Sequence, residues 1–200
     1  MPRLWSTVMS THSDLKLSKT RGSLRSITLR AMLLAVLVVQ EYVLSGIPQV
    51  QLTVILILVI AQFLPYSELI PFLIAYVLLD NLLMGSFSLL YTPTMMLIWP
   101  LYGIVARSLR HRPDYASFIL VIVFSFVYGW SFLPASIYIM KLDTWTKIWT
   151  YMSMDFPAEM MMAVVSIITF QLLYKPLREL LKYLFKRVDP NHHFPDDMSL

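Results

Sequence analysis

The side chains of this 200-residue chain that could recognise a solute gather at matching ends of its apolar segments. Glu41 lies near the end of the first segment, Asp80 and Asn81 near the end of the third, and Asp155 and Glu159 at the start of the sixth. These ends also carry amides and aromatic rings: Gln40, Gln49, Gln51, Tyr91, Tyr128, Trp130, Trp145, Trp149 and Tyr151. Carboxylates and amides beside aromatic rings are typical of a pocket for a small, flat, hydrogen-bonding solute.

The composition predicts the class of protein that must position these groups. Hydrophobic residues make up 58% of the chain and charged residues 14%, and the mean hydropathy is +0.65. A soluble domain has about 45–50% apolar and about 25% charged residues. The composition therefore disfavours a soluble enzyme, a disordered chain and a secreted disulfide scaffold, and predicts an all-α membrane protein.

Six apolar segments are separated by Gly, Pro and polar residues. They cover residues 31–44, 50–64, 69–84, 92–106, 115–140 and 156–173. A spanning helix needs about 20 mostly apolar residues, so six of them account for most of the apolar content. We therefore predict a six-transmembrane-helix bundle over residues 29–187, with a basic N-terminal tail over 1–28 and a polar C-terminal tail over 188–200. A basic amphipathic run after Tyr174 is expected to extend the last helix into the headgroup region.

The distribution of basic residues predicts the orientation. If the N-terminus is cytoplasmic, the inner segments hold fourteen of the sixteen Lys and Arg residues, and the outer loops hold only Lys141 and Lys147. This bias favours both termini in the cytoplasm and a multi-pass protein of the cytoplasmic membrane. The outer end then has five acidic residues against two lysines, which would suit a cationic or donor-rich solute.

Each polar group also has a structural interpretation. The sequence Asp155-Phe156-Pro157-Ala158-Glu159 is typical of a helix start, with Asp155 as the N-cap. Asp80 could contact ligand or make an interhelical hydrogen bond, and Asp80 and Asn81 cannot both face lipid without cost. Glu41 could be solvated at the interface. The aromatic residues that follow the fifth segment could form an interfacial belt (Trp145, Trp149 and Tyr151).

The sequence offers no motif for catalysis or for a cofactor. Cysteine is absent and no histidine lies in an apolar segment, so we expect no thiol chemistry and no histidine-ligated metal within the spans. The five glycines are scattered and form no phosphate-binding loop. We therefore expect no enzyme activity, cofactor or metal. The net charge of +4 reports membrane topology rather than nucleic-acid binding.

Small residues four apart mark helix faces that allow close packing. The first segment begins Ala31-Met32-Leu33-Leu34-Ala35, and the fifth contains Ser125 and Gly129. Residues 28–187 resemble the substrate-binding (S) components of energy-coupling factor vitamin transporters. The features that carry this resemblance are the six-helix size, the basic N-terminus, the Ala31–Ala35 pair, the link 45–50 and the final helix from Phe156 to Leu177.

The resemblance implies a division of labour. An S component captures a vitamin or precursor in an outward-facing pocket, and a transmembrane coupling protein with two ABC-type ATPases drives uptake. Ala31 and Ala35 would then lie on the face that docks against the coupling protein. The pocket would use Tyr91, Trp130, Asp155 and Glu159, with residues 45–49 as a lid. The resemblance does not identify the vitamin.

Two other classes remain open at this stage. A cell-shape or division scaffold resembling the rod-shape protein D family would also be small, multi-span and basic-tailed, and would need no pocket. An ion-coupled carrier is a third possibility, although the chain lacks the internal repeat that many such folds have.

Overall fold

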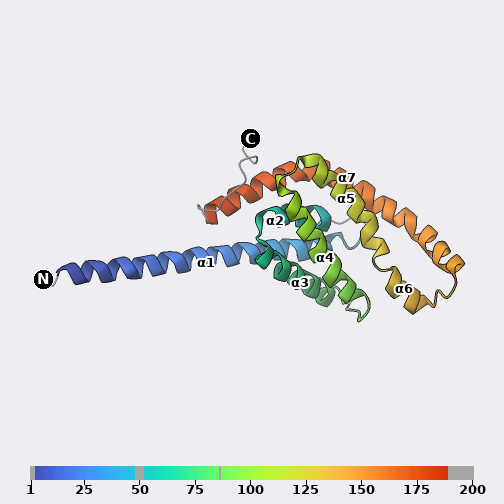
Figure 1. The fold of residues 1–200 in the computed structure, drawn as a ribbon, viewed down its shortest axis with the longest axis horizontal. Helices are drawn as coiled ribbons and strands as arrows, with labels where there is room; N and C mark the ends of the chain where they lie inside the picture. Colours follow the sequence, from blue (N-terminus) through green and yellow to red (C-terminus); the bar gives the residue numbers. More distant parts are fainter. Residues whose placement is uncertain (1–2, 48–51, 86, 189–200) are drawn as a thin grey trace.

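The computed structural model describes residues 3–47, 52–85 and 87–188, with side chains from Leu24 onward. The described residues are almost entirely helical, and no strand occurs among them. The helices are α1 (Arg3–Leu44), α2 (Thr53–Phe63), α3 (Tyr66–Leu83), α4 (Tyr91–Ser108), α5 (Asp114–Trp130), α6 (Leu133–Met140) and α7 (Trp145–Val188), with a 3-10 turn at Leu109–His111 (Figure 1).

Four stretches are long and apolar enough to cross a membrane. They are Leu24–Leu44, Tyr66–Leu83, Asp114–Met140 and Trp145–Val188, the third combining α5 with α6. The expectation of an all-helical protein is confirmed for the described residues, and the apolar helices are compatible with a membrane protein. Each of the six predicted apolar segments overlaps one helix, or α5 together with α6.

Helix α1 differs from the expected basic tail. It begins at Arg3, so the predicted tail over 1–28 is mostly helical and continuous with the first apolar segment. Figure 1 shows its N-terminal part extending away from the other helices. Residues 48 and 49 of the expected lid, and residues 189–200, lie outside the described residues.

The short helix α2 forms the centre of the packing. Ten of its eleven residues are buried, and it contacts α1, α4, α5 and α7. At 1.5 Å per residue it is only about 16 Å long, against a hydrocarbon core of about 30 Å. Because it is apolar on all sides, its stability depends on helices surrounding it completely.

Side chains from neighbouring helices satisfy both ends of α2. At its start, the Leu52 amide donates to Gln40 Oε1 at 3.0 Å, and the Thr53 hydroxyl donates to Glu41 Oε1. At its end, Arg107 Nη1 donates to the carbonyl oxygen of Leu64. Backbone groups at helix ends lack partners within the helix, and the dipole favours an anion at the start and a cation at the end.

Removing the cation at the end of α2 should destabilise the bundle. We expect Arg107→Leu to lower the free energy of unfolding by about 1–3 kcal/mol, because the Leu64 carbonyl would lose a charged donor. Arg112→Leu is the matched control, since Arg112 is exposed just before α5. Equal losses of melting temperature in the two purified variants would contradict this role for Arg107.

Aromatic rings fill the core between α3, α4 and α5. The Trp99 side chain is fully buried, and its ring centroid lies 5.1 Å from those of Phe124 and Tyr128 and 5.9 Å from that of Tyr76. Aromatic pairs at these separations and tilts pack favourably. This cluster packs the middle of α3 against α4, and α4 against α5.

Helix α7 corrects the expected start of the last helix. It begins at Trp145, so Asp155 lies ten residues inside the helix and is not its N-cap. The helix then runs unbroken through the amphipathic segment to Val188, as predicted. Figure 1 shows α7 bending across the bundle, and near its end Phe185 stacks on Phe63 with ring centroids 5.4 Å apart. The apolar side of this segment therefore covers the end of α2.

Candidate functional site

A cavity of about 410 Å³ lies where the end of α5 and the start of α7 meet the ends of α3, α4 and α6. Its walls combine amide, hydroxyl, carboxylate, aromatic and thioether groups. The lining residues are Asn81, Tyr91, Met95, Tyr128, Gly129, Phe132, Ser136, Tyr151, Asp155, Glu159 and Met162. We call this cavity the polar pocket. Its volume lies within the range of about 300–1,000 Å³ that is usual for small-molecule sites.

Close packing of α5 on α7 builds one wall of the polar pocket. Ser125 Oγ donates to Ser166 Oγ at 3.3 Å, one turn below the pocket. If a Cβ were added to Gly129, its three nearest atoms would all belong to the Glu159 carboxylate. The predicted small pair Ser125 and Gly129 therefore does mark a close helix contact, and glycine leaves the space that the Glu159 side chain occupies.

Two acidic residues near the start of α7 share one side of the helix. Asp155 and Glu159 are four residues apart, and both line the polar pocket. Asp155 is half-buried, whereas Glu159 is only 6% exposed. Glu159 Oε2 has no hydrogen-bond partner among the described residues. A buried carboxylate oxygen without a partner is energetically costly, and a ligand could provide the partner.

Asn81 ties α3 to α4 at the opposite wall. Its side chain donates to the carbonyl oxygen of Val77 at 2.8 Å and accepts from the Thr92 hydroxyl at 3.1 Å. The interhelical hydrogen bond that the sequence suggested for Asp80 is therefore made by Asn81. Asp80 is also buried, so neither of the two faces lipid, but its Oδ1 has no partner among the described residues and it does not line the polar pocket.

Aromatic rings form the remaining wall. The Phe132 ring centroid lies 5.7 Å from that of Tyr91 and 5.1 Å from that of Tyr128. Tyr151, on the first turns of α7, shares a 3.1 Å hydrogen bond with Ser136 on α6. These contacts fix the rings before any ligand arrives, so a flat solute would meet a preformed surface.

Eight residues were predicted to bind the solute, and the structure brings four of them together; the eight are Gln40, Glu41, Asp80, Asn81, Tyr91, Trp130, Asp155 and Glu159. Asn81, Tyr91, Asp155 and Glu159 line the polar pocket. Gln40 and Glu41 instead hold the start of α2, where Glu41 Oε1 also accepts from the Tyr76 hydroxyl at 3.2 Å. The side chain of Trp130 is 44% exposed beside Phe126 and is outside the pocket, as is Asp80.

Sequence reasoning did not place Gly129, Phe132, Met95 or Ser136 in the site, and it assigned Met162 to packing. One pattern could have found two of them. Gly129 belongs to the small pair that predicts the face of α5 packed against another helix, and Tyr128 and Phe132 are four residues apart along the same stretch. The aromatic residues Trp145 and Trp149 are exposed, with ring centroids 6.1 Å apart, as expected of a belt.

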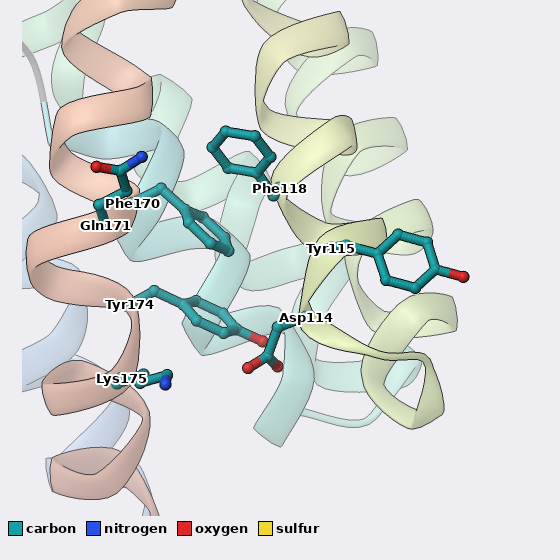
Figure 2. Close-up of a pocket in the computed structure, with 7 residues that line it drawn as sticks. All are labelled: Asp114, Tyr115, Phe118, Phe170, Gln171, Tyr174 and Lys175. Carbon is teal, nitrogen blue, oxygen red and sulfur yellow. The ribbon is translucent and has the colours of Figure 1, made fainter.

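A second cavity, of about 430 Å³, lies at the other end of α5 (Figure 2). Figure 2 shows the Tyr174 hydroxyl pointing toward the Asp114 carboxylate, with the Phe170 ring beside it. The Asp114 carboxylate already has a basic partner, because Arg178 Nη1 lies 3.1 Å from Asp114 Oδ1. The Tyr174 hydroxyl accepts from Gln62 at 3.2 Å. The polar groups of this cavity therefore link α5, α7 and α2 to one another, and fewer of them than in the polar pocket are left to bind a solute.

A shallow apolar groove runs along α1, lined by Ala35, Val36, Val39, Gln40, Val43, Leu44 and Leu52. Ala31 and Ala35 are both exposed. The predicted small pair thus lies on a face of α1 that the described part of the chain leaves uncovered.

The geometry of the polar pocket suits binding of a small solute. Within residues 24–47, 52–85 and 87–188, no group of three or more His, Asp or Glu side chains could hold a metal ion. The pocket provides carboxylate and amide acceptors, hydroxyl groups and aromatic surfaces, which are the groups that orient a ligand.

Comparison of the chain with protein-family models, with curated proteins and with solved structures finds no match.

Proposed function

We propose that the chain is the membrane-embedded solute-capture subunit of an energy-coupling factor type ABC uptake transporter. It binds a vitamin or vitamin precursor in the polar pocket and passes it on through a transmembrane coupling protein and two ABC-type ATPases. The observation that carries the proposal is the pocket itself, a cavity of about 410 Å³ lined by Glu159, whose buried carboxylate oxygen Oε2 has no partner among the described residues.

In this proposal the chain crosses the cytoplasmic membrane six times, with both termini in the cytoplasm. The four long apolar stretches give four of these crossings, and the proposal assigns the other two to α4 and to the short helix α2, which the surrounding helices shield from lipid. The end of the bundle opposite the polar pocket carries Arg30, Arg107 and Arg178. Because basic residues favour the cytoplasmic side, the pocket opens to the exterior.

Site-directed labelling tests this orientation, and the natural chain has no cysteine to give background. Thr146→Cys lies at the start of α7 near the pocket, and Arg112→Cys lies between α4 and α5; both residues are exposed. A membrane-impermeant maleimide added to intact cells is expected to label the Thr146→Cys variant. The Arg112→Cys variant is expected to be labelled only after the cells are permeabilised. The reverse pattern would contradict the orientation.

A thermal-shift panel tests solute capture. The purified full-length chain is heated with each of a set of water-soluble vitamins and precursors, and the melting temperature is recorded. A ligand present at 100 times its Kd stabilises the folded state by about 2.7 kcal/mol, which raises the melting temperature by several degrees. A scaffold would be stabilised by none of these compounds, and that result would favour the scaffold over the capture subunit.

A further inference from the structure

The polar pocket is lined by acidic side chains without a basic partner. Its walls contain two carboxylates, Asp155 and Glu159, and none of the residues that line it is Lys, Arg or His. Of the two lysines near this end, Lys147 is bonded to Asp143 at 2.6 Å, and this hydrogen bond lowers the pKa of the Asp143 carboxyl. Lys141 is exposed at the end of α6.

Glu159 gives the clearest indication of the ligand group that the pocket would bind. The residue is more than nine-tenths buried and lines the pocket, and its Oε2 has no partner among the described residues. An ionised carboxylate in such a place needs a cation or strong donors to offset its lost hydration. Asp155 is one turn away on the same side of α7, so both acids can face one bound group.

The aromatic wall is suited to the same kind of ligand. The rings of Tyr91, Tyr128 and Phe132 lie together, with centroids of neighbouring rings 5.1–5.7 Å apart. Tyr151 adds a fourth ring on the α7 side. The faces of aromatic rings attract cations, most strongly where water is excluded, and rings arranged around a site recognise ammonium groups.

We propose that the polar pocket selects a small organic cation, one that carries an ammonium or amidinium group on a flat or compact body. Glu159 and Asp155 supply the counter-charge, the rings of Tyr91, Tyr128, Phe132 and Tyr151 enclose the cationic group, and Asn81 orients the remainder. This inference rests on the proposed function, because it names the class of solute that the capture subunit takes.

Pairs of compounds that differ mainly in charge provide the test. The purified full-length chain is titrated with choline and benzamidine, with their uncharged analogues 3,3-dimethyl-1-butanol and benzamide, and with cationic, neutral and anionic vitamins. We expect cations to raise the melting temperature and their uncharged analogues to leave it unchanged. If a neutral or anionic compound is the one that stabilises the chain, the inference is overturned while the capture function stands. If no compound of any charge stabilises it, both fail.

Two substitutions assign the effect to the carboxylates of the pocket. Glu159→Gln is expected to lower the affinity for the best cation by about 30-fold or more, and Asp155→Asn to lower it less, since Asp155 is more exposed. Glu179→Gln makes the same chemical change at an exposed position of α7 and should leave the affinity unchanged. Unchanged cation affinity in both Glu159→Gln and Asp155→Asn would overturn the proposal. Folding of each variant is checked by its melting temperature without ligand.

Discussion

Replacing Gly129 with alanine is expected to weaken solute binding by about 10- to 100-fold while the chain still folds. The added Cβ would occupy the place of the Glu159 carboxylate, which supplies all three of its nearest atoms. That carboxylate is the far end of a flexible side chain, so it can move without displacing the backbone of α7. The fold is therefore retained, but the main acceptor of the polar pocket is displaced. Isothermal titration with the stabilising solute measures the loss.

Ser108→Thr is the control for this substitution. It also adds one methyl group to the chain, at an exposed residue at the end of α4 away from the polar pocket. We expect Ser108→Thr to bind as the natural chain does. If Gly129→Ala also retains full affinity at an unchanged melting temperature, Glu159 does not contact the solute.

The double variant Ala31→Trp, Ala35→Trp is expected to reduce uptake in cells to background while leaving solute binding intact. Both alanines are exposed on α1, and Ala35 lines the apolar groove, so tryptophan can be accommodated without disturbing the fold. A coupling helix that packs closely on small residues would be kept away by two large rings. Transport of labelled solute measures uptake, and titration of the purified chain measures binding.

Val123→Trp serves as the control for added bulk, because Val123 is 51% exposed on α5. It should leave both uptake and binding unchanged. Normal uptake by the double variant would exclude this face of α1 as the docking surface. Loss of binding by the double variant would instead indicate that α1 affects the pocket.

The positions of the helices could largely be predicted from the sequence, because hydrophobic segments and their breaks are local properties. Every predicted apolar segment overlaps a helix, and the helix continues through the basic C-terminal run as expected. The burial of that run against Phe63 could not be predicted, because it depends on how α7 packs across the end of α2.

The start of α7 illustrates how a local pattern can mislead. Asp155, Pro157 and Glu159 match a helix start, yet the helix passes through them. Proline at 157 removes a single hydrogen bond, the one to the carbonyl of Ser153, and Ser153 is exposed. The loss is therefore tolerated, and Asp155 becomes available as part of the pocket wall.

The site was only partly predictable because depth along a helix is easier to infer than direction around it. Trp130 lies at the right depth, but it follows Gly129 by about 100° around the helix and its ring is outside the polar pocket. Gln40 and Glu41 also lie at the expected end. At the start of α2 the Leu52 amide donates to Gln40 and the Thr53 hydroxyl donates to Glu41 instead, and these partners become visible only when the helices are packed together.

A structure of the chain bound to the solute that raises its melting temperature most would test the central claim directly. We predict that the solute lies in the polar pocket, within hydrogen-bonding distance of Glu159 Oε2 and against the rings of Tyr128 and Phe132. A solute found in the cavity beside Asp114, in the groove along α1 or outside the bundle would contradict the account.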